Sequence, residues 1–323
     1  MFDRIILHLG TPKTGTTGLQ QYLSETSDVL AEKGVHYVKS FRRGPSHNYL
    51  MRLLRQPDKE DFIQRKLNQE LQQSSGETAV ISTETAYGVF GTSKVLAALK
   101  PDMRERVQIL CYARRQDLFL EAMAKQKAKN ALFDGSLQAF CAHPKQQKKA
   151  SYLAFANQIA KRFPEVRIHF RAFDRSQLED GDVVQDFCAF AGLATEDRPE
   201  NRYNEANRTP SLQVVEAVRN YPFDGNVHRR ATLREIMKQD KGDYFRSRDV
   251  MPPDMREQII DLYAKENREL FRRYGDGNVS GFAAFDPARH DNHIGDTEQR
   301  TTAEHEAHTL VAAAAATCAL AAE

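Results

Sequence analysis

Short apolar runs alternate with longer amphipathic segments along most of this 323-residue chain. The apolar runs have the length of buried strands, whereas the longer segments repeat their apolar positions with the period of a helix. This pattern predicts strands at 4–9, 35–38, 79–82, 106–113 and 166–170. It predicts helices at 14–32, 47–56, 58–73, 92–99, 116–130, 150–162, 181–191, 209–220 and 253–274. Strands that are separated by helices form a parallel sheet covered on both faces, so the expected fold class is α/β.

The C-terminal part differs in composition from the rest of the chain. From about residue 286 it carries acidic residues, an alanine-rich end at 312–322 and four histidines, His290, His293, His305 and His308. The spacing of these histidines does not match that of zinc sites, so no metal site is predicted here. We expect one α/β domain at 1–285 with a helical C-terminal part, and a tail at 286–323 that is flexible or helical.

Composition and charge exclude several classes of protein. Apolar residues make up 41% and charged residues 28% of the chain, as in an ordinary soluble enzyme. The net charge of +2 gives no general attraction for polyanions, so no nucleic-acid partner is predicted. No window reaches the ~18 apolar residues of a membrane helix, and the first apolar run is too short for a secretory signal. The four cysteines are widely spaced without a CxxC pair, which favours reduced thiols in a cytoplasmic protein.

The turn after the first predicted strand carries the most chemical information. It consists of Thr11, Pro12, Lys13, Thr14, Gly15, Thr16 and Thr17, and the apolar stripe of a helix follows it. The first amides of a helix lack internal partners and lie at the positive end of the helix dipole, so this geometry can hold a phosphate. Lys13 adds a cation, and the threonines add hydroxyls. In a Walker A loop the lysine directly follows the second glycine, whereas here Thr16 follows Gly15.

A second anion-binding element is predicted where the strand 106–113 ends. Arg114 and Arg115 follow this strand directly, and ligands of open parallel sheets bind at the carboxyl ends of the strands. Two adjacent guanidinium groups can hold a phosphate through paired hydrogen bonds. The alternative is a surface ion pair between Arg114 and Asp117.

Both motifs resemble those of the sulfotransferases that use 3′-phosphoadenosine 5′-phosphosulfate (PAPS). The loop 11–17 is similar to the family's 5′-phosphosulfate loop, and the segment 112–117 is similar to its 3′-phosphate site. Weaker similarity at 171–187, 207–211 and 267–270 extends the resemblance over about 1–275. The resemblance implies a P-loop NTPase-like three-layer sandwich with a central parallel sheet. It further implies that residues 11–17 and Arg114 bind PAPS and its product PAP, and that Lys13 also serves in catalysis.

One position departs from the family pattern. The family pairs the arginine at the strand end with a serine eight residues later, and this chain has Ala122 at that position. Either one hydroxyl contact is lost or another residue supplies it.

Sulfonate transfer also needs a base that accepts the proton of the attacking group. Glu84 directly follows the predicted strand 79–82, and it resembles the acidic base of several carbohydrate sulfotransferases. His47 begins a predicted helix and resembles the catalytic histidine of other members. We favour Glu84 as the base, with His47 as the second candidate or as an acceptor-binding group. The structural alternatives are an interaction with a helix dipole or a salt bridge for Glu84, and a hydrogen bond at the helix start for His47.

The expected function is transfer of a sulfonate group from PAPS to a hydroxyl or amine of a carbohydrate or small metabolite, without a metal. The alternatives are a divergent P-loop nucleotide kinase or hydrolase, and a non-catalytic nucleotide-binding relative that Ala122 would suit. Basic residues recur at 42–43, 125–129 and 145–149, where they can bind an anionic sugar polymer or form a solvated face. The sequence leaves the acceptor and the oligomeric state open.

Overall fold

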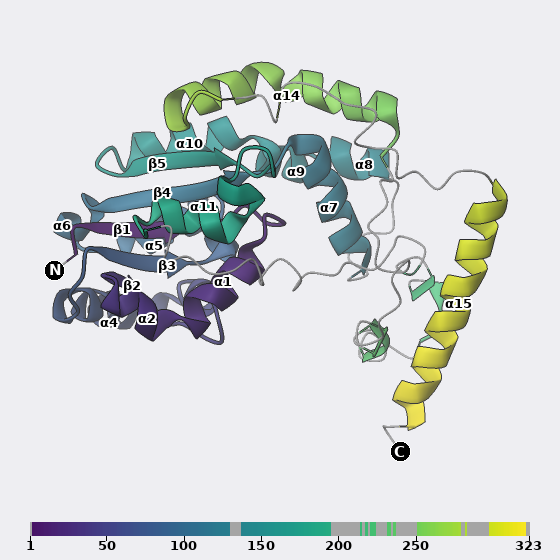
Figure 1. The fold of residues 1–323 in the computed structure, drawn as a ribbon, viewed down its shortest axis with the longest axis horizontal. Helices are drawn as coiled ribbons and strands as arrows, with labels where there is room; N and C mark the ends of the chain where they lie inside the picture. Colours follow the sequence, from purple (N-terminus) through teal and green to yellow (C-terminus); the bar gives the residue numbers. More distant parts are fainter. Residues whose placement is uncertain are drawn as a thin grey trace. The chain divides into compact units, whose positions relative to one another are not determined.

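The computed structural model describes residues 2–129, 137–194, 214, 217–218, 220–223, 231–233, 235–236, 251–278, 282 and 297–320. Within this part of the chain, five parallel strands form one sheet in the order β2-β3-β1-β4-β5 (Figure 1). The strands are β1 (Arg4–His8), β2 (Val35–Tyr37), β3 (Thr78–Ser82), β4 (Val107–Ala113) and β5 (Arg167–Ala172). The central strand β1 pairs with β3 on one side and with β4 on the other. Because the strands are parallel, all five carboxyl ends lie at one edge of the sheet.

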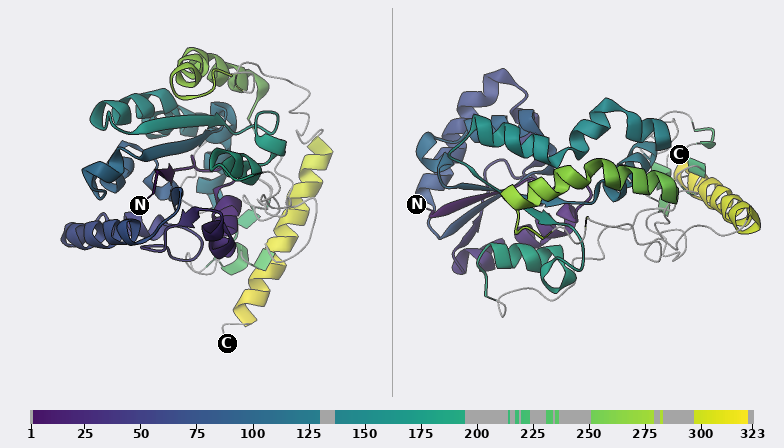
Figure 2. Two further views of the ribbon diagram at one scale, coloured as in Figure 1. Left: turned by 60° about the vertical axis from the view of Figure 1, so that its left-hand side comes forward. Right: turned by 90° about the horizontal axis from the view of Figure 1, so that it is seen from above.

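Helices lie on both faces of this sheet (Figure 2). Those in the first half are α1 (Thr16–Glu25), α2 (Ser27–Glu32), α3 (Asn48–Leu53), α4 (Glu60–Gln73), α5 (Val89–Ala97), α6 (Pro101–Arg104) and α7 (Gln116–Lys129). The helices in the rest of the described chain are α8 (Leu137–Ala142), α9 (Pro144–Ala150), α10 (Tyr152–Arg162), α11 (Val183–Phe190), α14 (Pro253–Tyr274) and α15 (Thr297–Leu320). Single 3₁₀ turns are η1 (Pro57–Lys59), η2 (Glu84–Ala86) and η3 (Glu179–Gly181).

The two faces of the sheet bury separate apolar cores, because successive side chains of a strand point to opposite faces. On one face Ile6 packs with Leu19 of α1 and Phe187 of α11. On the other face Ile5 and Leu7 pack in a larger core, to which α3, α4, α5, α10 and the end of α14 contribute. The central parallel sheet between helical layers confirms the predicted α/β class.

The chain divides into two compact units. The first comprises Met1–Phe119, Lys148–Asn207 and Ile260–Ala284, and it contains the sheet. The second comprises Leu120–Gln147, Arg208–Ile259 and Phe285–Glu323. In the second unit α15 buries Leu310 and Val311 in a core with Val218 and Ile236. Within 286–323, α15 is the helix that the structure describes.

Several element boundaries differ from those expected from the sequence. The predicted helix 14–32 is two helices, α1 and α2, which are separated at Thr26. The Thr26 hydroxyl donates to the Tyr22 carbonyl at 2.7 Å, a local bond that competes with regular helix geometry. The short helices α6, α8 and α9 were not predicted. Most of the predicted helix 209–220, the turn at 207–211 and the histidines His290 and His293 lie outside the described residues.

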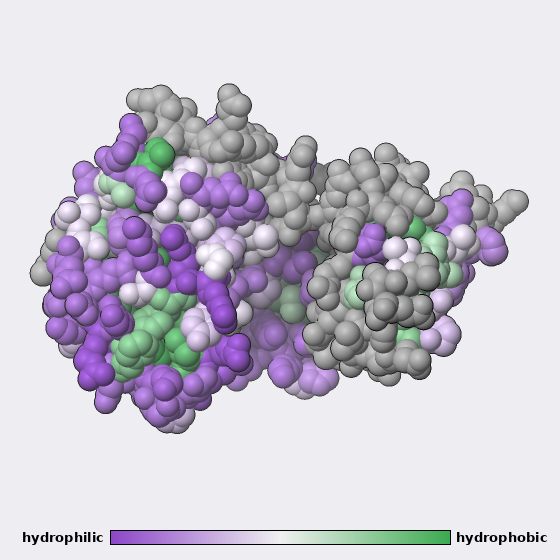
Figure 3. Space-filling model, turned by 90° about the horizontal axis from the view of Figure 1, so that it is seen from below, coloured by the Kyte–Doolittle hydropathy of each residue, from purple (hydrophilic) through white to green (hydrophobic). Residues whose placement is uncertain are grey.

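The coloured residues on the face in Figure 3 are mostly hydrophilic, with the largest hydrophobic area at the lower left and smaller ones elsewhere. In the described part of the chain the exposed large hydrophobic residues are Val29, Phe62, Phe90 and Leu262. None of the helices in that part is both long enough and apolar enough to cross a bilayer.

Candidate active site at the carboxyl edge of the sheet

The loop between β1 and α1 has an unusual backbone. Gly10 and Gly15 adopt φ values of 66° and 70°, which favour glycine. A Cβ atom on Gly10 would lie 2.6 Å from Cγ2 of Thr16, and one on Gly15 would lie 2.9 Å from Cγ1 of Val183. Lys13 also has a positive φ of 72°, which costs a residue with a side chain about 1–2 kcal/mol. Neighbouring contacts must therefore hold the loop in this conformation.

Hydrogen bonds within the loop and to β4 supply such contacts. The backbone N–H and the hydroxyl of Thr11 both donate to the Tyr112 carbonyl, at 3.1 and 2.9 Å. The buried Thr14 hydroxyl donates to the Thr11 carbonyl at 2.6 Å. These two hydroxyls therefore serve the shape of the loop. Thr17 is exposed at the start of α1, and Pro12 and Lys13 are partly exposed.

The buried carboxylate of Asp186 fixes strand β4, whose Tyr112 carbonyl accepts from Thr11. The Tyr112 hydroxyl donates to Asp186 at 2.8 Å, and Asp186 also accepts two hydrogen bonds from Arg171, at 2.5 and 2.7 Å. The N–H of Glu179 donates to the same carboxylate at 3.2 Å. Asp186 of α11 thus links β4 and β5 through its hydrogen bonds to Tyr112 and Arg171. The sequence signal for this role was a lone acid in the apolar helix 183–190, which sequence reasoning treated only as family pattern.

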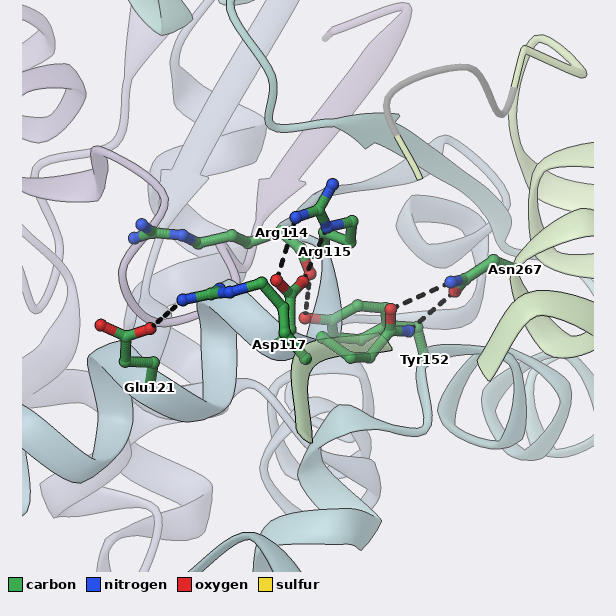
Figure 4. A network of polar contacts seen from close by, with 8 residues as sticks. Arg114, Arg115, Asp117, Glu121, Tyr152 and Asn267 are labelled. Carbon is green, nitrogen blue, oxygen red and sulfur yellow. Dashed lines mark hydrogen bonds and ion pairs between the residues drawn. The ribbon is translucent and has the colours of Figure 1, made fainter. Parts of the chain in front are cut away.

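The two arginines after β4 have different roles. Arg115 donates to both oxygens of the buried Asp117, at 2.7 and 3.0 Å (Figure 4). Arg114 instead donates through Nη1 to the Lys13 carbonyl at 3.1 Å, and its own carbonyl accepts from the Tyr152 hydroxyl at 2.7 Å. The acid that follows the strand therefore binds Arg115, not Arg114, and the Arg114 guanidinium lies at the loop.

Glu84 reaches the same loop from the opposite side. It lies in η2, directly after β3, and its Oε2 accepts from the Thr16 hydroxyl at 2.6 Å. Asn48 holds the segment around Glu84 in place, because its Oδ1 accepts from the N–H of Thr85 and the hydroxyl of Thr83. The strand order thus explains the convergence: β3 and β4 flank β1, and each sends one charged side chain to the loop that follows β1.

His47 lies at the same edge but is fully buried. Its Nε2 donates to the Val38 carbonyl at 2.7 Å, and its Nδ1 accepts from the N–H of Ser82 at 3.2 Å. Burial lowers the pKa of His47 to about 4, against smaller opposing effects of these two bonds. Both ring nitrogens are thus engaged by the backbone of two strand ends, an arrangement that suits a neutral, structural imidazole.

A second buried histidine, His8, ends strand β1 just before the loop, and the sequence analysis did not identify it. Nδ1 of His8 lies 2.8 Å from the Ser82 hydroxyl, which also accepts from Gln20 of α1 at 3.0 Å. Within the described residues Nε2 of His8 has no hydrogen-bond partner, and burial lowers its pKa to about 3. A histidine inside the apolar run 4–9 gave no sequence signal beyond its position at the strand end.

These two histidines predict a loss of stability in mild acid. Both must stay neutral in the folded protein at pH values where the unfolded chain, with pKa near 6.5, binds protons. The folding free energy is therefore lost as pH falls below about 6.5 towards the folded pKa values. We expect roughly 2 kcal/mol of loss per histidine between pH 7 and pH 5. Urea unfolding at pH 7, 6 and 5 measures it.

The variant His8→Gln keeps a polar partner for Ser82 and does not titrate, so it should remove the share of His8, roughly 2 kcal/mol, from this loss. His308, which is exposed on α15, supplies the matched control as His308→Gln. An unchanged loss in His8→Gln would show that His8 is not buried in its neutral form.

The described residues contain no group of three or more His, Cys, Asp or Glu side chains placed to hold a metal ion. The four cysteines are free thiols, and Cys111, Cys141 and Cys188 are buried.

No protein-family profile matches the chain. An uncharacterized protein of Archaeoglobus fulgidus is 27% identical over 176 residues, which cover 52% of this chain and 45% of that protein. The chain thus spans less than half the length of this relative. The crystal structure of a sulfotransferase from Alicyclobacillus acidocaldarius is similar with a TM-score of 0.47 and 14% identity, over 86% of this chain and 98% of that one. Neither similarity assigns an activity to this chain.

Proposed function

We propose that this protein is a sulfotransferase that moves a sulfonate group from PAPS to a hydroxyl or amine, on a carbohydrate or small metabolite. The observation that carries the proposal is the convergence of two charged side chains on one anion-binding loop. Arg114 donates to the Lys13 carbonyl from the β4 side, and Glu84 accepts from Thr16 on the β3 side. A transferase of this kind needs cations for the phosphates and a base for the acceptor at one place.

The residues of the loop fit a nucleotide with two separate phosphate groups. Gly10 and Gly15 have positive φ, and Thr16 and Val183 pack where their Cβ atoms would lie, so the loop needs glycine at both positions to keep this shape. The start of α1 and Lys13 would hold the 5′-phosphosulfate, and Arg114 would hold the 3′-phosphate. When bound, the donor supplies an activated sulfonate on a phosphate leaving group. The Lys13 ammonium is suited to neutralise the charge that develops on that leaving group.

Glu84 is the better candidate for the base. Its carboxylate is partly exposed and accepts one hydrogen bond from Thr16, so oxygen lone pairs remain that can take the proton of an acceptor. His47 is buried, and both of its ring nitrogens already hold backbone groups. We therefore assign proton transfer to Glu84, and we assign to His47 the alignment of the strand ends β2 and β3.

The kinase-like alternative has less support at this loop. Thr14 is the hydroxyl residue that follows Lys13, and its hydroxyl donates to the Thr11 carbonyl. A magnesium-binding hydroxyl would need to face the nucleotide instead.

The four free thiols also support the placement of this protein in the cytoplasm.

Nucleotide preference tests the proposal directly. We expect adenosine 3′,5′-bisphosphate to bind 10- to 100-fold more tightly than AMP, ADP or ATP, since a charge-assisted paired contact is worth roughly 1.5–3 kcal/mol. The Arg114→Ala variant should lose most of this preference. Because Arg114 also contacts the Lys13 carbonyl, we expect a small additional loss of AMP affinity. Calorimetric titration of the four nucleotides measures both effects.

Arg167→Ala is the matched control for this experiment. Arg167 is exposed and begins β5, so it lies at the amino edge of the sheet, away from the loop. Its loss removes one positive charge and should leave all four affinities unchanged. If ATP binds the wild-type protein as tightly as the bisphosphate does, the sulfotransferase proposal is wrong.

A further inference from the structure

Two neighbouring guanidinium groups, those of Arg42 and Arg43, follow β2. The centre of the Arg42 guanidinium lies 5.0 Å from the centroid of the Tyr37 ring, and that of Arg43 lies 5.1 Å from the Tyr49 ring. Within the described residues neither guanidinium takes part in an ion pair. A guanidinium over an aromatic ring keeps its in-plane N–H groups available for an anion.

One of these groups is already shielded from solvent. Nη1 of Arg42 is buried and has no hydrogen-bond partner within the described residues. A buried N–H of a cation without an acceptor is unfavourable. Arg42 is otherwise partly exposed and Arg43 is exposed, so their other N–H groups are the ones that an anion can reach.

Glu70 lies next to the loop between β2 and α3 (residues 38–47), and its carboxylate binds the backbone of this loop. The two oxygens of Glu70 accept from the backbone N–H groups of Lys39 and Ser40, both at 2.6 Å. One of the oxygens also pairs with His36 at 2.9 Å. Burial opposes this charge, yet the bonds from His36, Ser40 and Lys39 together lower the pKa of Glu70 to about 2. Glu70 thus holds the start of the loop and is not used to neutralise Arg42.

The rest of the loop is held as firmly. The Tyr37 hydroxyl donates to the Pro45 carbonyl at 2.7 Å, and the N–H of Arg43 donates to the Ser46 carbonyl at 3.0 Å. Phe41, which has a φ of 63°, packs edge-to-face against Phe62. A loop fixed at its start, middle and end presents its side chains with little ordering cost when a ligand binds.

This loop adjoins the segment that carries Glu84. The ring centroids of Tyr37 and His47 lie 5.1 Å apart, and the backbone N–H of His47 donates to the Ser82 carbonyl at 2.9 Å. Asn48, next in sequence, holds the Thr83–Thr85 segment. The guanidinium groups and the proposed base therefore stand on adjacent strand ends at one edge of the sheet.

We propose that Arg42 and Arg43 form an acceptor subsite that binds a carboxylate or sulfate group carried by the acceptor molecule. The inference rests on the proposed transferase function, because it assigns this loop to the acceptor. It names the acceptor class as an anionic hydroxyl compound, which distinguishes it from neutral sugars and metabolites.

Binding of three sugars to the full-length protein tests this subsite. With adenosine 3′,5′-bisphosphate present and ionic strength fixed, NMR titration compares glucuronic acid, glucose 6-sulfate and glucose. We expect at least one of the two anionic sugars to bind about tenfold more tightly than glucose, as charge-assisted hydrogen bonds at a partly exposed site allow. Comparison of the carboxylate with the sulfate identifies the preferred group.

Variants of Arg42 and Arg43 test whether these two residues cause the preference for anionic sugars over glucose. Arg42→Ala and Arg43→Ala should each reduce the preference for the anionic sugar, and Arg42→Lys should retain part of it because the charge remains without the planar fork. Arg167→Ala should change nothing. Bisphosphate affinity, measured on each sample, should stay at the wild-type value.

Two results would overturn the subsite. One is the absence of any difference between the anionic sugars and glucose, including absence of binding; the other is a preference that survives both alanine variants. Either result leaves the proposed function standing if bisphosphate still binds with its expected preference. Loss of that nucleotide preference in the wild-type protein would instead refute the proposed function.

Discussion

Replacing Lys13 with alanine is expected to lower turnover by ~10²–10³-fold, the usual effect of removing one preorganised electrostatic donor. The bisphosphate affinity should fall much less, because the helix start and Arg114 remain. The reason is that the charge on the leaving phosphate grows during transfer, so an ammonium at this position stabilises the transition state more than the ground state. Single-turnover sulfonate transfer from labelled PAPS, with an acceptor taken from a panel of glycans and metabolites, measures the rate.

The backbone at Lys13 makes alanine the appropriate replacement. Lys13 already adopts a positive φ of 72°, so alanine faces the same strain and the loop should keep its shape. Lys161→Ala is the matched control, because Lys161 is exposed near the end of α10, shortly before β5 begins at the opposite edge of the sheet. Near-normal turnover in Lys13→Ala would remove Lys13 from catalysis, whatever its effect on binding.

The fold was predictable because its signals are local. Apolar runs of strand length at 4–9 and 106–113 alternate with amphipathic helices, and this pattern alone indicates a parallel sheet with two covered faces. The split at Thr26 was not predictable, because a helical threonine and a helix-ending threonine have the same sequence pattern. The Thr26 hydroxyl bond to the Tyr22 carbonyl accompanies the split, but Thr309 makes the same bond to the His305 carbonyl within α15, so this bond alone does not end a helix.

The site was only partly predictable, because sequence order does not specify pairing between side chains. Two arginines and an acid at 114–117 allow either guanidinium to form the ion pair, and only the geometry assigns Asp117 to Arg115. The polar residues that support the loop were missed for a related reason. His8 and Asp186 lie within apolar segments, and their partners are 74 positions away at Ser82 and Tyr112. The roles of Lys13 and Glu84 stay predictions, which kinetic measurements can test.

The Glu84→Gln variant is expected to lower the transfer rate by ~10²–10⁴-fold, the range that a general base contributes. Glutamine keeps the size of the side chain and an oxygen that can accept from the Thr16 hydroxyl, so only the proton-accepting charge is lost. Bisphosphate affinity should therefore remain near the wild-type value. The same single-turnover assay measures the rate, and calorimetry measures the affinity.

Strand β3 itself offers the matched control, because it has a glutamate at each end. Glu77 is exposed and directly precedes the strand, whereas Glu84 follows it, so Glu77→Gln removes an equal charge at the opposite edge of the sheet and should leave the rate unchanged. The variant His47→Gln separates the two candidate bases. It disturbs the bonds to the Val38 carbonyl and the Ser82 N–H, so we expect lower stability but a smaller loss of rate in the folded protein than in Glu84→Gln. The reverse ranking of the two rates, measured on protein shown to be folded by bisphosphate binding, would transfer the role of base to His47.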